Sequence, residues 1–295
     1  MELRQIRLNV FRVDAATTAA RALGLFAGEG LEVQIIVTPN STEQMRGLCQ
    51  GAFEIASTAF DNVLAWSGRE GAEIVAVAQT NDSVVLPVFV RPEIRDWKDL
   101  RGRKLAVDAV DTAYALVLRR ILLAHDLDLG RGDYELIPVG ATGPRLESMT
   151  RGETFAAILN PPYDSRAETE SLVRFGDHRG VLPHYPGGVL AVNRAWARSH
   201  RSDLAGFLRA WLTGVRWVKD PANCEEAIKI IASDLRLSPQ AAINILKDLS
   251  ADGTLNLAGL ETVLNLRIRF GFTPPMGRDL SSYYDAEYYR AAASN

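Results

Sequence analysis

Two stretches of this chain, Met45–Ala56 and Leu146–Ala157, follow the same pattern. Each combines an amphipathic helical segment, a glycine that ends it, a short turn and a short apolar strand. A polar loop follows each strand, Ser57-Thr58 in the first copy and Asn160–Tyr163 in the second. A unit used twice predicts two similar lobes. Two α/β lobes that face each other form a cleft, and clefts bind small molecules.

Composition narrows the possible partners. The 295 residues are 47% hydrophobic, which is enough for a large core and long for one compact α/β unit. The 33 basic and 36 acidic residues nearly balance without a Lys/Arg run, which argues against nucleic acid. No apolar run approaches the roughly 18–20 residues of a membrane span, so no membrane insertion is expected.

Cysteine and histidine spacing gives no sign of a metal. Cys49 and Cys224 lie in helical patterns without a CxxC motif, so we expect small buried side chains and neither a disulfide framework nor a zinc site. The histidines lack metal-ligand spacing, and no P-loop, Rossmann or GxSxG motif occurs. We therefore expect neither a metal nor a cofactor.

The first residues bear on location. Residues 1–25 are interrupted by charges and contain no apolar core of the length that a signal peptide needs. Either the protein is cytoplasmic as written, or it is periplasmic and Met1 replaces a removed leader. The sequence leaves both alternatives open.

Strand and helix patterns alternate along the first part of the chain, which predicts a mainly parallel sheet with helices on both faces. The predicted strands are Ile6–Phe11, Leu31–Val37, Ile55-Ala56 and Ile74–Ala78, and the predicted helices are Ala15–Glu29, Thr42–Cys49 and Asp61–Gly68. A second set follows, with strands Leu105–Val107, Tyr134–Val139 and Phe155–Leu159 and helices Thr112–His125 and Pro144–Arg151.

Two extended runs, Val84–Val90 and Gly188–Asn193, separate these sets. We expect them to be paired strands that cross between the lobes as hinges. Residues 1–84 and 188–295 then form a discontinuous first lobe, and residues 85–187 form an inserted second lobe. The rest of the chain is predicted to be helical, at Leu204–Val218, Glu225–Leu235, Pro239–Leu249 and Leu260–Arg269. A tyrosine-rich tail from Pro274 is expected to pack on the body.

Four segments in this order resemble one family. Ala22–Val33, Leu48–Ala56, Asp99–Val107 and Gly152–Leu159 are similar to successive motifs of the type II periplasmic binding proteins. The branch is the one that binds sulfonates, nitrate, taurine and thiamine-pyrimidine precursors for ABC transporters. The resemblance spans nearly the whole chain, and it implies a two-lobed α/β fold with a ligand cleft between the lobes.

The sequence departs from the family in two places. Phe155 stands where the second glycine motif usually has an acidic residue, and the first residues lack the pattern of the leader expected of exported family members. The same fold also carries enzymes, among them desulfinases, chorismate dehydratases, dihydroxyphthalate decarboxylases and pyrimidine synthases. A desulfinase would carry a cysteine after the first strand, and a pyrimidine synthase a cysteine-rich motif. In this chain the loop after the first strand is Arg12–Ala16, which contains no cysteine. Cys49 stands alone where a pyrimidine synthase would need a cysteine-rich motif.

In open parallel sheets a ligand lies beyond the carboxyl ends of the strands, and the resemblance implies that the same loops form the cleft walls. Asp14, Asp111 and Thr112 in these loops are also candidate helix caps. Pro161 and Pro162 stiffen the loop of Asn160 and Tyr163. The candidate ligand-binding residues are Arg12, Asp14, Ser41, Ser57, Thr58, Asn81, Asp82, Asp111, Thr112, Tyr114, Thr142, Asn160, Tyr163 and His184.

Two functions follow. Aspartates outnumber arginines in these loops, which favours a neutral, aromatic or amine-bearing ligand over a dianion. The first hypothesis is a solute-binding protein of an ABC-type transporter, or a leaderless cytoplasmic binding relative, that closes on a small organic molecule and has a permease as partner. The alternative is a cytoplasmic lyase or decarboxylase acting on a small aromatic or carboxylate substrate. Asp14, His184 or Tyr114 would be its acid or base. The lack of a recognisable catalytic constellation favours the first.

Overall fold

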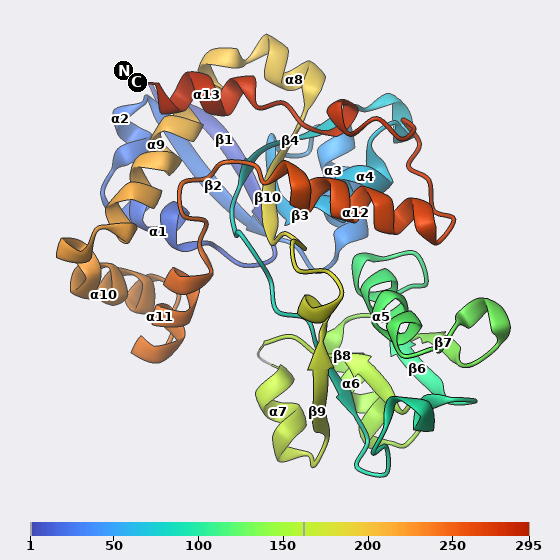
Figure 1. Cartoon of the computed structure of the whole chain (residues 1–295). Helices are drawn as coiled ribbons and strands as arrows, with labels where there is room; N and C mark the ends of the chain where they lie inside the picture. Colours follow the sequence, from blue (N-terminus) through green and yellow to red (C-terminus); the bar gives the residue numbers. More distant parts are fainter. Residues whose placement is uncertain (1, 162, 295) are drawn as a thin grey trace. The chain divides into compact units, whose positions relative to one another are not determined.

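The computed structural model describes residues 2–161 and 163–294, so Pro162 of the predicted stiff loop lies outside the described residues. Contacts divide the chain into two compact units, whose elements are labelled in Figure 1. Unit 1 consists of Met1–Val84, Pro186–Glu261 and Pro274–Asn295, and unit 2 of Val85–Tyr185 and Thr262–Thr273.

Unit 1 contains a five-stranded sheet in the order β2-β1-β3-β10-β4. Strands β1, β2 and β3 are parallel, and β10 runs antiparallel to both of its neighbours. It follows that β1 to β4 all point the same way. The strands are β1 (Arg4–Val10), β2 (Leu31–Val37), β3 (Ile55–Ala59), β4 (Ile74–Gln79) and β10 (Gly188–Asn193).

Helices cover both faces of this sheet, as the alternation along β1 requires. Ile6, Leu8 and Val10 of β1 join a core with α1 and α9, whereas Asn9 faces α3 and accepts a hydrogen bond from Gln44. The helices of unit 1 are α1 (Ala15–Ala22), α2 (Leu25–Gly28), α3 (Ser41–Gln50), α4 (Phe60–Trp66), α8 (Arg194–Ser199), α9 (Arg201–Lys219), α10 (Cys224–Asp234), α11 (Pro239–Asp248) and α13 (Glu287–Ala293). Helix α12 (Leu257–Arg269) begins in unit 1 and ends in unit 2.

Unit 2 has its own five-stranded sheet in the order β7-β6-β8-β5-β9. Strand β5 is antiparallel to β8 and β9, and β6 is parallel to β7 and β8. Phe89, Leu146 and Leu159 are among the buried residues of its core. Its elements are β5 (Pro87–Val90), β6 (Lys104–Val107), β7 (Glu135–Pro138), β8 (Ala156–Ile158), β9 (Val173–Asp177), α5 (Ala113–Ala124), α6 (Thr142–Thr150) and α7 (Tyr163–Thr169). Short 3₁₀ turns lie at Arg69–Gly71, Trp97–Leu100, Leu129–Arg131, His178–Gly180, Pro221–Asn223 and Leu280–Tyr283.

The two sheets have the same topology. In each, the second position (β1 or β6) lies between the edge strand that follows it in the chain (β2 or β7) and the central strand of the repeated motif (β3 or β8), and the fourth position holds an antiparallel strand. That antiparallel strand is the last strand of unit 1 (β10) and the first strand of unit 2 (β5). The repeated segments become α3-β3 and α6-β8, and Gly51 and Gly152 both adopt positive φ angles, 72° and 78°. Glycine takes this left-handed conformation without the Cβ penalty, so both helices turn sharply into the central strand. The predicted two-lobed α/β fold class is confirmed.

One predicted pairing is wrong. The chain enters unit 2 just before β5 and returns to unit 1 just before β10, as expected of crossover strands. However, β5 pairs with β8 and β9, and β10 pairs with β3 and β4, so the two are not partners. Only Pro87–Val90 of the first extended run is strand, with Pro87 at its first position, where a missing N–H is tolerated inside a sheet.

Other expectations need local corrections. The predicted helix Ala15–Glu29 breaks at Leu23-Gly24 into α1 and α2, since Gly24 has a φ of 69°. Ser57 and Thr58 belong to β3 and not to a loop. Cys49 is half-buried and Cys224 is exposed, so the second cysteine is not a core side chain.

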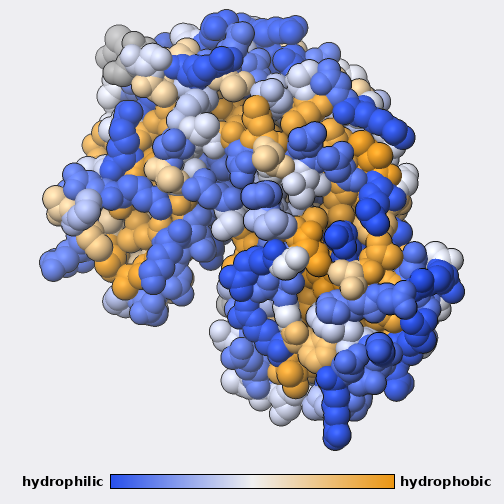
Figure 2. All heavy atoms as spheres, viewed as in Figure 1, coloured by the Kyte–Doolittle hydropathy of each residue, from blue (hydrophilic) through white to orange (hydrophobic). Residues whose placement is uncertain are grey.

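The segment 262–273, placed by sequence in the first lobe, groups with unit 2. The reason is its contact with α5 and the turn before it. The Nη1 of Arg267 donates to the carbonyl of Asp111 at 3.0 Å, and Arg119 stacks over Phe270 at 4.1 Å. The tyrosine tail packs as expected at Tyr283, which is fully buried, and at Tyr288. Figure 2 shows hydrophilic side chains over much of the visible surface of each unit, with hydrophobic ones between them.

Candidate functional site

Because β1 to β4 point the same way, their carboxyl ends form one edge of the unit 1 sheet. The predicted residues that lie at this edge or just beyond it are Arg12, Asp14, Ser41, Ser57, Thr58, Asn81 and Asp82. The topology therefore brings the unit 1 candidates to a common edge.

Asp14 caps helix α1. Its Oδ1 accepts from the Thr17 backbone N–H at 2.8 Å and from the Trp211 Nε1–H at 3.2 Å, and its Oδ2 accepts from the Thr17 hydroxyl at 2.7 Å. Burial raises the pKa of Asp14 above its usual value, and these hydrogen bonds oppose the rise. Both oxygens of the Asp14 carboxylate are therefore used in local hydrogen bonds, in agreement with the predicted capping role.

Asp82 and Asn81 anchor a later segment to the end of β4. Asp82 accepts from the Ser250 hydroxyl at 2.5 Å and from the Ala251 N–H at 2.9 Å. The Nδ2 of Asn81 donates to the carbonyl of Asp248 at 2.8 Å. We call residues 248–253 the strap. Its position beside β4 links sequence that lies more than a hundred residues apart to the same sheet edge.

A charged group borders the strap. Arg12 lies 3.8 Å from the Asp248 carboxylate, and both side chains are well exposed. Lys219 donates to the carbonyl of Leu249 at 2.7 Å, and burial lowers its pKa. Partial desolvation of the Asp248 carboxyl raises its pKa, and the charges of Arg12 and Lys219 oppose this rise. The sequence pattern gave no signal for Lys219, Asp248 or Ser250, because only the fold brings them to this edge.

The hydroxyl candidates of unit 1 differ in their surroundings. Thr58 is buried, and its Oγ1 accepts from the Nδ2 of Asn62 at 2.9 Å. Ser57 pairs with Leu190 in the ladder between β3 and β10. Ser41 is the first residue of α3, but the cap is Asn40, whose Oδ1 accepts from the Glu43 N–H at 2.9 Å.

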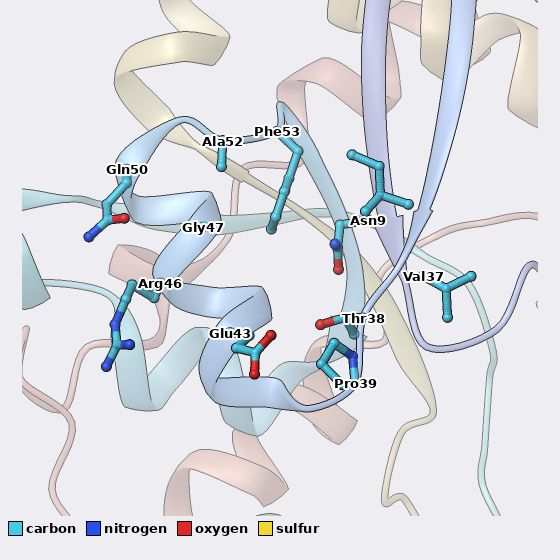
Figure 3. Close-up of a pocket in the computed structure, with 11 residues that line it drawn as sticks. Asn9, Val37, Thr38, Pro39, Glu43, Arg46, Gly47, Gln50, Ala52 and Phe53 are labelled. Carbon is cyan, nitrogen blue, oxygen red and sulfur yellow. The ribbon is translucent and has the colours of Figure 1, made fainter.

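An open hollow of about 350 Å³ lies between the end of β2 and α3 (Figure 3). Its walls include the buried ring of Phe53, its polar floor includes Asn9 and Thr38, and Glu43 and Arg46 project from α3. None of the predicted ligand-binding residues is among its lining residues.

In unit 2 the parallel strands β6, β7 and β8 likewise end at one edge, where a polar cluster surrounds Arg145. Arg145 is 1% exposed although it lies in the first turn of α6. Its Nη1 is 3.5 Å from Asp108, its Nη2 donates to the Thr142 hydroxyl at 2.8 Å, and its guanidinium lies 5.0 Å from the centre of the Tyr114 ring. Within the described residues its Nε has no hydrogen-bond partner.

The cluster continues to the end of β8. The Thr142 hydroxyl donates to the Oδ1 of Asn160 at 3.0 Å, and the Thr112 hydroxyl donates to Asp108 at 2.5 Å. We call Asp108, Thr112, Tyr114, Thr142, Arg145 and Asn160 the Arg145 cluster. It unites four predicted residues, Thr112, Tyr114, Thr142 and Asn160, with two that the prediction of the site left out, Asp108 and Arg145.

The electrostatics of the cluster suit binding better than proton transfer. Burial lowers the pKa of Arg145, with Asp108 and Tyr114 acting the other way, and an arginine stays charged regardless. Burial raises the pKa of Tyr114, so its phenol stays protonated at neutral pH. The positive charge of Arg145 is opposed by Asp108, which leaves the cluster near neutral.

The remaining unit 2 candidates lie around this cluster or apart from it. A Cβ on Gly143 would lie 3.2 Å from the Tyr163 hydroxyl, so Tyr163 packs directly on the first turn of α6. Asp111 is half-buried, and its carbonyl accepts from Arg267. His184 is exposed in the loop before β10, and within the described ranges it makes no hydrogen bond or ion pair to the Arg145 cluster.

The described residues offer neither a metal-binding cluster nor a membrane-spanning helix. Residues 2–161 and 163–294 hold no group of three or more His, Cys, Asp or Glu side chains arranged for a metal ion. Within the same ranges, no helix combines the length and apolarity needed to cross a bilayer.

Solved structures share this architecture. A protein of Bordetella bronchiseptica RB50 is 22% identical and superimposes with a TM-score of 0.76 over 99% of this chain and 98% of its own. The periplasmic nitrate-binding protein of Synechocystis PCC 6803 is 14% identical, with a TM-score of 0.76 over 99% of this chain and 89% of its own. Together with the two matched sheets, these similarities define the type II periplasmic-binding-protein fold.

Residues 14–224 match the family described as NMT1/THI5 like, and the chain belongs to this family. A formylaminopyrimidine-binding protein of Halalkalibacterium halodurans is 25% identical over 219 residues. That match covers 72% of this chain and 63% of the relative, so it spans less than two thirds of the relative's length.

Proposed function

We propose that this chain binds a small organic molecule as the solute-binding component of an ABC-type import system. The observation that carries the proposal is the matched topology of the two sheets, which gathers polar candidates at one carboxyl edge in each unit. Ligands of open α/β sheets bind beyond such edges, and hinge closure would bury the ligand from water. Membership of the NMT1/THI5-like family supports it.

The proposed ligand is a neutral or amine-bearing heteroaromatic compound similar to formylaminopyrimidine. The Halalkalibacterium relative is named for binding that compound. The charge of Arg145 is already opposed by Asp108 and its Nη2 is used by Thr142. A free anion such as nitrate would need an unopposed guanidinium or ammonium group. The Arg145 cluster therefore favours a polar but uncharged ligand surface.

The enzyme alternative finds less support in the candidate acids and bases. Asp14 caps α1, the pKa of Tyr114 is raised so that it cannot serve as a base near neutral pH, and His184 is exposed away from the cluster. A general base works best with a pKa near the working pH. Binding and release of an unchanged ligand is the simpler function for this arrangement.

Isothermal titration calorimetry of the purified chain with formylaminopyrimidine tests the proposal, with nitrate as the contrasting anion. We expect one site for the pyrimidine. A ligand present at 100 times its Kd should stabilise the folded state by about 2.7 kcal/mol in urea unfolding. Binding of nitrate alone would overturn the proposed ligand class. A change in the mass of the pyrimidine after incubation would favour the enzyme alternative.

The partner and location belong to the same proposal. An ABC permease would receive the ligand, and capture would take place outside the cytoplasmic membrane, as for the periplasmic nitrate-binding neighbour. Cell fractionation of the native organism, with detection of this chain by antibody, tests the location. Recovery in the cytoplasm would leave a leaderless cytoplasmic binding protein.

A further inference from the structure

The direction of one hydrogen-bond chain in the Arg145 cluster has a consequence for what the site can recognise. A guanidinium has five N–H donors and no acceptor, so the 2.8 Å contact between Arg145 and Thr142 must have the threonine oxygen as its acceptor. The Thr142 hydroxyl keeps a single hydrogen. That hydrogen points to the Oδ1 of Asn160, which lies 3.0 Å away.

Among residues 2–161 and 163–294, this order leaves the Nδ2 of Asn160 without a hydrogen-bond partner. Its Oδ1 is used by Thr142, and its Nδ2 carries two N–H donors. Asn160 is half-buried and directly follows Leu159 at the carboxyl end of the central strand region. If the amide were turned over, Nδ2 would face Thr142 Oγ1 and the hydroxyl hydrogen would lose this acceptor.

The chain is held from its buried end. Arg145 is 1% exposed, lies 3.5 Å from Asp108, and stacks on the ring of Tyr114. A buried charged donor with two such contacts has little freedom to rotate away, so Thr142 is kept as an acceptor from one side and a donor to the other. The polarity of Asn160 thus depends on a residue that need not touch the ligand.

Building on the proposed function, we propose that Asn160 is the specificity-determining donor of unit 2, and that the ligand presents a hydrogen-bond acceptor to it, a carbonyl oxygen or an unprotonated ring nitrogen. Arg145 and Thr142 are positioning residues. A compound that places an N–H donor at that point brings its donor against the N–H donors of Asn160, and the site rejects it. Asn160→Asp reverses the polarity, because a carboxylate only accepts.

Two measurements test this, one with ligand and one without. In calorimetry with formylaminopyrimidine we expect Asn160→Asp to weaken binding at least about 100-fold and Thr142→Val about 10-fold. The control is Thr150→Val, the same change at an exposed site of α6 whose hydroxyl bonds only within the helix. Unchanged affinity in Asn160→Asp would overturn the inference.

The second measurement uses nitrogen-15 NMR of the ligand-free chain, with the Asn160 side-chain signals assigned by their loss in Asn160→Asp. We expect both Nδ2 protons to exchange rapidly with water in the wild type, and the signals to shift in Thr142→Val but not in Thr150→Val. Protons protected by a bond to Thr142 would overturn the inference. If the wild type fails to bind formylaminopyrimidine, the proposed ligand fails, and this NMR result still decides the role of Asn160.

Discussion

Asp14 separates structural from ligand-binding roles because two substitutions remove different parts of it. In Asp14→Asn the remaining oxygen still accepts from the Thr17 N–H and the Trp211 Nε1–H, and the new NH₂ donates to the Thr17 hydroxyl. Asn caps helices as well as Asp does. Burial already disfavours the charge of Asp14. We therefore expect the free energy of unfolding of Asp14→Asn to lie within about 1 kcal/mol of the wild-type value.

Asp14→Ala removes the contacts themselves. Loss of the helix cap costs about 1 kcal/mol. The Trp211 side chain is fully buried, so leaving its Nε1–H without an acceptor costs about 1–3 kcal/mol more. The sum is a loss of roughly 2–4 kcal/mol in the free energy of unfolding. Urea titration followed by circular dichroism measures both variants.

The pH dependence gives a second check on the sign. The pKa of Asp14 is raised in the folded state, so the folded state binds the proton more tightly than the unfolded state does. The wild type therefore loses stability as pH rises from the unfolded pKa of about 3.9 through the raised folded value. Asp14→Asn lacks this loss, so its advantage should grow over that window and then stay constant.

Two outcomes would refute this reasoning. If Asp14→Asn loses as much stability as Asp14→Ala, the charge itself stabilises α1 and burial does not dominate. If Asp14→Asn folds like the wild type but no longer binds formylaminopyrimidine, the carboxylate contacts the ligand and is more than a cap. Equal binding by both proteins would assign Asp14 to structure alone.

Three further changes have clear directions. Gly214→Ala puts a Cβ 2.5 Å from the Ala16 carbonyl oxygen, so urea unfolding should show a loss of about 3 kcal/mol, and an unchanged midpoint would contradict this packing. Gly47→Ala meets the Phe53 ring at 2.6 Å and should cost about 1–3 kcal/mol, with much of the loss recovered in a Phe53→Leu background. Burial lowers the pKa of His178, so stability should fall as pH drops below the unfolded value of about 6.5, and His178→Gln should flatten that slope between pH 7.5 and 5.5.

Much of the fold could be predicted because its signals are local. Helix and strand periods, together with the glycines that end α3 and the motif before β8, gave two matched α/β lobes. The errors lie where distant sequence decides. The extended pattern of β10 predicts that it pairs with β5, yet this strand lies between β3 and β4. No local pattern encodes which sheet an apolar strand will join.

The candidate site was predictable to the same degree. The strand-end rule selected both Thr142 and Asn160, which share a hydrogen bond in the structure. The prediction considered Arg145 only as one of several charged residues in these loops. The sequence at a loop–helix junction does not show whether an arginine is buried. An arginine in the first turn of a helix after a strand was the available signal. Burial, which makes Arg145 important, appears only once the fold is known.

The position of β10 also sets the order in which the chain can fold. Strands β3 and β4 are not neighbours in the sheet, and the strand between them is synthesised only after residues 85–185. Until then both strands present open edges, which favour association with other chains. Most of unit 2 is already synthesised by that time. The nascent N-terminal segment should therefore depend on chaperones, and a chain stopped at Val84 should aggregate where a chain extended past Asn193 can close its sheet.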